Sequence, residues 1–170
     1  MSDVTIRQAQ GDDLQAVLYV GHSTWPPTYG PIAGDDYVAM GLAKWWTADA
    51  TIPAIRAGRV TVAEVDGKVV GVATVGPQDG HLMLWKLYVL PGQQGHGIGQ
   101  ALMAAVLDQA REGGFAQVRL SYLDGNTSAA RFYAKAGFEE FDRECGGSGL
   151  PDSVWVRRSV DPQQQTGEAR

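Results

Sequence analysis

Three glycines alternate with other residues directly before an apolar helical pattern. Gly95, Gly97 and Gly99 follow a β-rich segment that Pro91 ends, and the apolar pattern continues to about Glu112. Small residues at a helix N-terminus leave several backbone N–H groups unobstructed, and the helix dipole adds partial positive charge there. The chain therefore contains a strand, turn and helix whose turn suits a pyrophosphate and needs no basic side chain. A tight turn selected for packing alone is the alternative.

Two other phosphate-binding patterns do not match this turn. A Rossmann domain has Gly-x-Gly-x-x-Gly and an acidic residue about 20 positions further on. Here the spacing is Gly-x-Gly-x-Gly, and Asp124, the nearest acidic residue that ends the next strand, lies farther away. A P-loop needs Gly-Lys followed by Ser or Thr, and the chain contains no such run.

The order of the patterns along the chain indicates a mixed α/β sheet. Strand patterns cover 4–8, 60–65, 69–75, 81–90, 116–123, 138–144 and 154–160, and helical patterns cover 14–22, 35–46, 97–112 and 126–136. Asp66-Gly67 predicts a hairpin, and the prolines between Trp25 and Pro31 predict a break after the first helix. Residues 77–80 predict a further turn. We expect one domain over 1–160, with about seven strands flanked by four helices, and a disordered tail over 161–170.

Composition narrows the classes of function. The net charge of −5 and the lack of a Lys/Arg run argue against a nucleic-acid partner. No stretch reaches the roughly 18 apolar residues of a membrane span, and the polar N-terminus with Ser2 and Asp3 does not match a signal peptide. We therefore expect a cytoplasmic protein with no membrane partner. Cys145 has no second cysteine to pair with, and one cysteine with three histidines predicts no metal site.

Two segments together resemble the GNAT superfamily of N-acetyltransferases. Its signature is Arg or Gln, two residues, Gly, one residue, then Gly or Ala, and the run 94–99 (Gln-Gly-His-Gly-Ile-Gly) matches it directly after a Leu-Tyr-Val strand end. The second motif of the family is Asn-x-x-Ala-x-x-x-Tyr-x-x-x-Gly-Phe. It is matched by Asn126, Ala129, Tyr133, Gly137 and Phe138. The resemblance covers the element order from Val4 to Val160 and implies the GNAT fold.

The resemblance also implies that acetyl-CoA is the cosubstrate. In the family the fourth and fifth strands splay apart, and the pantetheine arm lies along the fourth like an added strand. The resemblance implies that backbone groups of Leu87, Tyr88 and Val89 bind the pantetheine. The implied contacts of the pyrophosphate are the side chain of Gln94 and the backbone amides of Gly95, His96, Gly97, Ile98, Gly99 and Gln100. Asn126 is implied to bind near the cysteamine end. Gln94, unlike an arginine, contributes hydrogen bonds but no charge. By residue type Asn126 equally suits a helix N-cap, and we expect both roles.

Tyr133 is the implied general acid. A thiolate that leaves acetyl-CoA needs a proton, and a phenol with an ordinary pKa of about 10 stays protonated at neutral pH. A buried core tyrosine is the alternative reading.

The general base is not evident from the sequence. Met83 and Trp85 stand where relatives often place one, and neither side chain titrates. His81 shares their face by alternation, and Glu64 lies on a nearby strand, so both are candidates, with a plain surface role the commoner reading for each.

Aromatic residues crowd the region of the first two helices, where the resemblance places the acceptor pocket. The run from Trp25 to Ile32 resembles the Trp-x-x-x-Tyr-x-x-Ile of small-molecule members, so Trp25 and Tyr29 are candidate substrate contacts. Tyr37, Trp45 and Trp46 lie nearby. Aromatic rings can hold an ammonium, but they equally suit a core, and only one of the two adjacent tryptophans can face inward.

The sequence therefore favours an enzyme that moves an acetyl group from acetyl-CoA to a primary amine, of a small molecule, by direct attack. Ser121 stands where acetyltransferases of ribosomal-protein N-termini carry a glutamate, which argues against that class. A protein or peptide acceptor is the second hypothesis. A non-catalytic acyl-CoA-binding module is the third, since no base is evident. Relatives are often dimers, so a homodimer is an expectation by analogy.

Overall fold

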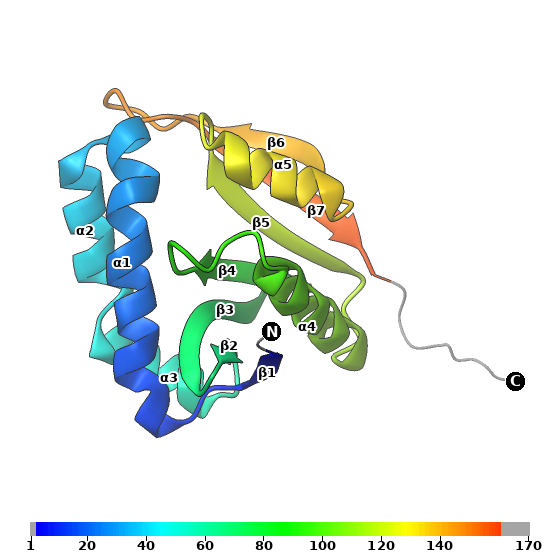
Figure 1. Cartoon of the computed structure of the whole chain (residues 1–170). Helices are drawn as coiled ribbons and strands as arrows, with labels where there is room; N and C mark the ends of the chain where they lie inside the picture. The colour runs from blue at the N-terminus through cyan, green and yellow to red at the C-terminus, as the bar shows by residue number, and fades with distance from the viewer. Residues whose placement is uncertain (1–2, 161–170) are drawn as a thin grey trace, which may run out of the picture. The chain divides into compact units, whose positions relative to one another are not determined.

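A computed structural model describes residues 3–160, which form seven strands, five α-helices and one short 3-10 helix (Figure 1). The strands are β1 (Val4–Gln8), β2 (Val60–Val65), β3 (Lys68–Gln78), β4 (His81–Val89), β5 (Gln117–Leu123), β6 (Glu139–Glu144) and β7 (Ser153–Ser159). The helices are η1 (Gly11–Asp13), α1 (Leu14–Ala33), α2 (Asp35–Trp45), α3 (Ala48–Arg56), α4 (Ile98–Glu112) and α5 (Thr127–Lys135). The predicted tail, 161–170, and Ser2 lie outside the described residues.

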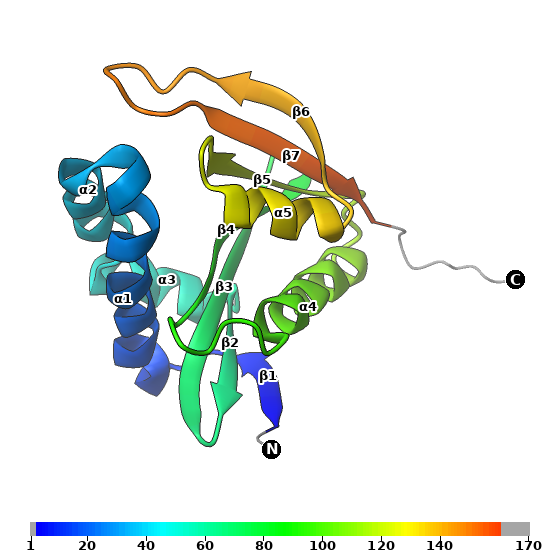
Figure 2. The ribbon, with the colours of Figure 1, turned by 45° about the horizontal axis from the view of Figure 1, so that its top comes forward.

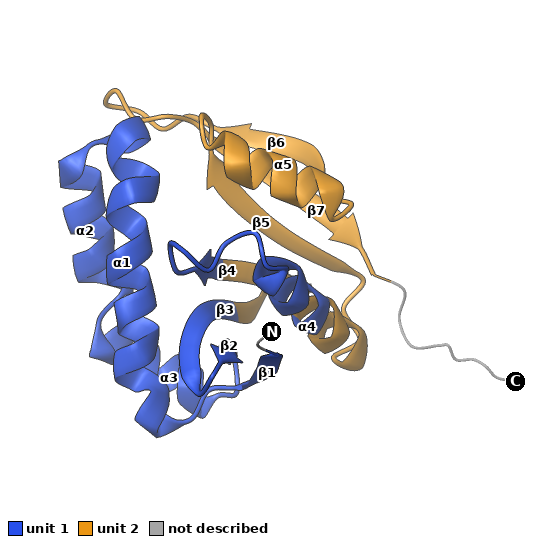
Figure 3. Cartoon of the chain, viewed as in Figure 1, with its two compact units in different colours: residues 1–74, 86–105 blue, residues 75–85, 106–170 orange. Residues whose placement is uncertain are grey.

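The chain divides into two compact units, coloured separately in Figure 3. Unit 1 comprises Met1–Thr74 and Lys86–Ala105, and unit 2 comprises Val75–Trp85 and Val106–Arg170. The boundary passes through β3, β4 and α4. One domain over 1–160 stays a prediction.

The strands form a mixed sheet in the order β1-β2-β3-β4-β5-β7-β6. In unit 1, β2 pairs antiparallel with β1 and β3. The predicted hairpin is confirmed, because Asp66 and Gly67 adopt φ of 52° and 78° between β2 and β3. Across it, Val62 and Val72 are register partners and fully buried. Alternating β-branched residues thus form the sheet that the sequence predicts.

Helix α1 is longer than predicted. The prolines were expected to end it, yet it continues to Ala33 with Pro26, Pro27 and Pro31 inside. Each proline removes one backbone hydrogen bond. All three prolines are exposed, so water can reach the carbonyls that lose a donor. The opposite face buries Trp25 and Tyr29, and this packing offsets the lost bonds.

Helix α3 was not predicted, so the expected four helices are five. Thr47 caps it, because its hydroxyl accepts a hydrogen bond from the Ala50 N–H at 3.1 Å. Thr51 and Ile55, four residues apart, are buried on one face. The N-cap threonine and this spacing were the available signals, and Pro53 inside the helix obscured them.

In unit 2, β7 pairs antiparallel with both β5 and β6, and α5 lies alongside β5 and β7 (Figure 2). The strand residues Val118, Leu120, Val154 and Val156 are buried.

The turn predicted at residues 77–80 is shorter than expected. β3 includes Pro77 and ends at Gln78, and of these four residues only Asp79 and Gly80 adopt positive φ.

The close packing of α1 against Trp46 gives a stability prediction. A Cβ at Gly21 would lie 2.0 Å from the Trp46 indole, which is 1% exposed, whereas a Cβ at Gly30 on the same helix meets nothing within 3.5 Å and only Asp35 at 3.8 Å. Gly21→Ala should lower the free energy of unfolding by about 1–3 kcal/mol through overpacking. Gly30→Ala, the control, should be neutral or stabilising by about 0.5 kcal/mol. Denaturant unfolding of both variants checks this, and equal stabilities would contradict the packing.

Candidate active site

The glycine turn joins the end of β4 to the start of α4 within unit 1. The Leu90 N–H donates to the Val70 carbonyl at 2.8 Å, and the Gln93 N–H donates to the Leu90 carbonyl at 3.0 Å. Gly95 and Gly97 adopt φ of 88° and 77°, which residues with a Cβ rarely adopt. A Cβ at Gly95 would meet no atom within 4 Å. Backbone conformation, rather than internal crowding, therefore requires glycine there.

The N-terminus of α4 presents free backbone donors at this turn. The first helical hydrogen bond runs from the Ala101 N–H to the Gly97 carbonyl at 3.0 Å. The N–H groups of Ile98, Gly99 and Gln100 precede it and so have no partner in the helix. Gly95, His96 and Gly97 are exposed, so the turn that leads into these amides, at the positive end of the helix dipole, lies at the surface.

Two buried side chains fix the first turn of α4 in unit 1. Ile98 is 2% exposed and Leu102 is fully buried. Both pack over Gly71 of β3: a Cβ there would lie 3.0 Å from Leu102 Cδ1 and 3.3 Å from Ile98 Cγ2. The missing side chain at Gly71 therefore allows the helix to approach the strand.

Gln94 has a role within the turn. Its side-chain Nε2 donates to the Val89 carbonyl at 3.0 Å. Val89 was expected to pair with pantetheine through its backbone, and a carbonyl oxygen can accept two hydrogen bonds, so the bond from Gln94 does not prevent that pairing. Gln94 thus holds the turn to the end of β4.

The aromatic residues of α1 and α2 form a packed cluster. Trp25 stacks on Tyr37 with ring centroids 5.7 Å apart, and Tyr29 lies 4.5 Å from Trp25. Trp25 and Tyr29 are 5% and 9% exposed, and burial raises the pKa of Tyr29 to about 12. The Tyr29 hydroxyl is 2.8 Å from the Tyr88 hydroxyl, which ties α1 to β4. Both candidate substrate contacts therefore have core packing, and a substrate role for them stays a prediction.

The two adjacent tryptophans differ as expected. Trp46 is 1% exposed and Trp45 is 36% exposed. The Trp46 carbonyl lies 3.1 Å from His22 Nε2, and its ring lies 5.6 Å from that of Tyr88. Only Trp46 faces inward.

Sequence reasoning missed Lys86, the only lysine in β4. Its ammonium lies 4.2 Å from the centroid of the Trp46 ring and donates to the Trp45 carbonyl at the C-terminus of α2. Burial lowers the pKa of Lys86 to about 8. A single charged residue in an otherwise apolar strand was the available signal. Lys86 joins the end of α2 to β4 within unit 1.

In unit 2, the second motif forms the start and middle of α5. Asn126 is the N-cap, because its Oδ1 accepts from the Ala129 N–H at 3.2 Å. The capping role is therefore confirmed, and the cofactor contact stays a prediction. Tyr133 is half-buried and stacks on Tyr122 of β5 at 6.1 Å, with Phe138 packed edge-on at 5.7 Å. Tyr133 has defined neighbours, but it is not a fully buried core residue.

The pairing between β4 and β5 is short. Within the described residues, the parallel ladder consists of Leu82 with Val118 and Met83 with Arg119. β5 continues to Leu123 in register with β7. The ladder thus ends four residues before Leu87 on β4.

The two candidate bases, Glu64 and His81, lie in different surroundings. Glu64 accepts from Arg7 at 3.2 Å, and the same guanidinium forms two bonds with Asp13 at 2.8 and 3.0 Å. The hydrogen bonds from Arg7 are the largest cause of the lowered pKa of Asp13. His81 has a buried Nδ1 with no hydrogen-bond partner among the described residues. Met83 is buried and Trp85 is 48% exposed.

The described residues form neither a metal-binding cluster nor a membrane-spanning helix. Residues 3–160 contain no cluster of three His, Cys, Asp or Glu side chains placed to hold a metal ion. In the same range no helix has the length and apolarity to cross a bilayer.

Solved structures share this arrangement of strands and helices. The PaiA N-acetyltransferase of Thermoplasma acidophilum, in complex with coenzyme A, superposes with a TM-score of 0.83 at 20% identity, covering 93% of this chain and 99% of the other. The ribosomal-protein-S18-alanine N-acetyltransferase of Escherichia coli superposes with a TM-score of 0.68 at 18% identity, covering 99% of both chains. The fold is that of an N-acetyltransferase.

The sequence gives the family directly. Residues 22–138 match the Acetyltransferase (GNAT) family, and the chain belongs to it. An uncharacterised N-acetyltransferase of Mycobacterium bovis is 36% identical over 115 residues, covering 67% of this chain and 72% of that protein. A mycothiol acetyltransferase of Sanguibacter keddieii is 41% identical over 137 residues, covering 75% of this chain and 41% of that protein. The chain is thus an acyltransferase of the GNAT family.

Lys86 gives a prediction for stability against pH. Its pKa is about 8 in the folded chain and about 10.5 as the reference value. Between these values the unfolded chain binds more protons, so the free energy of unfolding rises with pH. The rise between pH 8 and 10 is at most about 2 kcal/mol. Tyr29, whose pKa is raised, opposes this only above about pH 10.

Lys86→Met removes this dependence, and Lys44→Met, at an exposed position of α2, is the control. Denaturant unfolding at pH 8 and pH 10 should show the wild type and Lys44→Met gaining stability relative to Lys86→Met. Parallel curves for all three would contradict the burial of the amine.

Proposed function

We propose that this enzyme transfers the acetyl group of acetyl-CoA to the primary amine of a small molecule. Membership of the GNAT family supports acetyl transfer to an amine. The observation that supports acetyl-CoA as the cosubstrate is the turn at Gly95 and Gly97, because its backbone amides and the N-terminus of α4 suit a diphosphate. The complex of the PaiA enzyme with coenzyme A supports the same cosubstrate. Mycothiol acetyltransferases among the relatives support a small acceptor.

The local structure of each segment supports the proposed cofactor contacts. The amides from Gly95 to Gln100 hold the pyrophosphate. The backbone of Leu87, Tyr88 and Val89 pairs with the pantetheine amides, which the end of the β4–β5 ladder at Met83 favours. Gln94 keeps the turn in place, and Asn126 adds a contact beside its capping role.

The chemistry needs one proton donor. The acceptor nitrogen attacks the thioester carbon, the C–N bond forms, and the C–S bond breaks. Tyr133 gives its phenolic proton to the leaving sulfur, and the ammonium formed by the attack loses a proton to solvent or to a base. The Tyr133 phenolate then takes a proton from solvent, which restores the enzyme. Tyr133 suits this role because the side chain is positioned by Tyr122 and Phe138 yet half-accessible.

Gly95→Ala tests the diphosphate site. A Cβ at φ 88° costs about 1–2 kcal/mol, so the turn rearranges and the affinity for coenzyme A should fall roughly tenfold. Gly80→Ala is the matched control, because its φ of 81° lies in an open hairpin turn. It should lose similar thermal stability and keep its affinity in calorimetry. Unchanged affinity in Gly95→Ala would overturn the assigned site.

Tyr133→Phe tests the acid. It should bind coenzyme A as the wild type does and transfer acetyl on the order of 10²-fold more slowly, while Tyr122→Phe, its stacked neighbour, stays within about threefold. Turnover is measured on small amines, peptide N-termini and lysine peptides. Unchanged turnover in Tyr133→Phe would remove the acid, and a preference for peptides would overturn the small acceptor.

A further inference from the structure

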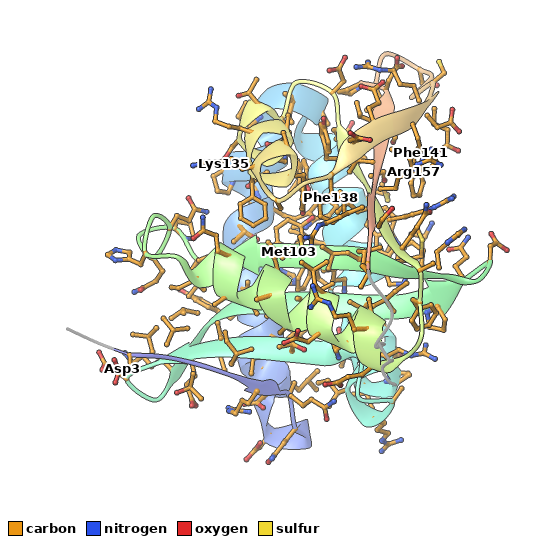
Figure 4. All side chains as sticks on the ribbon, turned by 90° about the vertical axis from the view of Figure 1, so that its right-hand side faces the viewer. Asp3, Met103, Lys135, Phe138, Phe141 and Arg157 are labelled. Carbon is orange, nitrogen blue, oxygen red and sulfur yellow. The ribbon has the colours of Figure 1, made fainter. Side chains whose placement is uncertain are left out.

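Two arginines share one phenylalanine ring in unit 2. The Arg119 and Arg157 guanidinium carbons lie 4.6 and 4.9 Å from the ring centroid of Phe141. Figure 4 labels Phe141 and Arg157 next to each other. Arg119 and Arg157 are also register partners on β5 and β7. Three neighbouring strands therefore contribute to one cluster.

A β-bulge brings the ring to this place. The register between β6 and β7 shifts between Glu140 and Asp142, so Phe141 is the additional residue. A bulge redirects a side chain relative to regular alternation. The ring lies on the face of Arg119, whereas Tyr122, of opposite alternation on β5, stacks on Tyr133 of α5. The cluster is therefore on the face of these strands away from α5.

Neither guanidinium has an acidic partner among residues 3–160. Like charges opposite each other in a ladder are unfavourable. Arg119 Nε donates to the Gln117 side chain at 3.0 Å, and no ion pair of Arg119 or Arg157 is found among residues 3–160. Glu139, the register partner of Arg157 on β6, makes no ion pair with it. Glu140, the register partner of Val156, and Asp124 both pair with Arg143 and act on Tyr122 of the opposite face.

This geometry suits an oxyanion. A guanidinium stacked on a ring loses little side-chain freedom when it binds and can present N–H groups at its edge, which in Arg119 are the Nη groups, because its Nε donates to Gln117. Two such edges side by side match the oxygens of a carboxylate or a phosphate. In a chain with net charge −5, a local pair of cations is needed to attract such a group.

We propose that Arg119 and Arg157, stacked on Phe141, bind the carboxylate or phosphate of an acidic amine acceptor. This inference rests on the proposed function. Arg119 belongs to the last pair of the β4–β5 ladder, so the cluster lies where β5 leaves β4. Ser121 and Trp155 are the next register pair of β5 and β7 on this face, so they lie beside the two arginines. The acceptor class is therefore a small primary amine that also carries an acidic group.

The test compares Arg157→Gln, Arg119→Gln and Arg157→Lys with Arg56→Gln, an exposed arginine at the end of α3. Substrates are primary amines in matched pairs that differ in a terminal carboxylate or phosphate against a methyl group. Both glutamine variants should raise KM for the acidic amine roughly tenfold or more, without a change in its kcat or in either constant for the neutral amine. Arg157→Lys should give a KM for the acidic amine between those of the wild type and Arg157→Gln. Arg56→Gln should match the wild type. Equal effects on acidic and neutral amines would overturn the proposal.

A second measurement does not depend on turnover. Inorganic phosphate titrated into the wild type should shift the Nε–H NMR signals of Arg119 and Arg157 to saturation and inhibit the acidic amines competitively, and neither glutamine variant should show the shift. Phosphate shifts that persist in both variants would overturn the anion site. Failure to acetylate any amine, with coenzyme A bound and phosphate shifts present, would instead overturn the proposed function.

Discussion

The approach of α4 to β3 within unit 1 is the contact on which the turn depends. Ile98 and Leu102 pack over Gly71, and a Cβ there would lie 3.3 Å from the Tyr88 carbonyl as well as close to both side chains. This packing fixes the direction of the helix, and the direction of the helix fixes where its unpaired N–H groups point. The affinity of a turn without basic side chains comes from such fixed dipoles, so a buried apolar contact determines a polar site.

Local signals in the sequence predicted the strands, the hairpin between β2 and β3, and one helix cap. Alternating valines gave β2 and β3, Asp66-Gly67 gave their hairpin, and Asn126 gave the cap of α5. Each of these depends on neighbours within a few residues. The second half of α1 and the whole of α3 were missed because the prolines in them oppose a helix locally. Burial of Trp25 and Ile55, which only the folded chain shows, outweighs that opposition.

The candidate site also contains residues that local sequence patterns predicted and residues that they did not. The glycine turn and the Tyr133 segment are continuous motifs, so their residue types were readable from the chain. The contacts of Lys86 depend on where α2 ends, and the cluster of Phe141 depends on a one-residue shift of register. The spacing of residues in the sequence predicts neither of these arrangements. The same limit explains why Trp25 and Tyr29 suited a pocket wall by residue type, although the structure packs them against α2.

The prolines of α1 have a further consequence for how unit 1 is held together. Residues 22–33 lack three of the hydrogen bonds of an ordinary helix, so this stretch has little stability as an isolated helix. Its order comes from the Trp25 ring, which lies where a side chain on Gly41 of α2 would otherwise stand. The end of α1 and the body of α2 therefore form one cooperative element, so a change that disorders one of them destabilises the other.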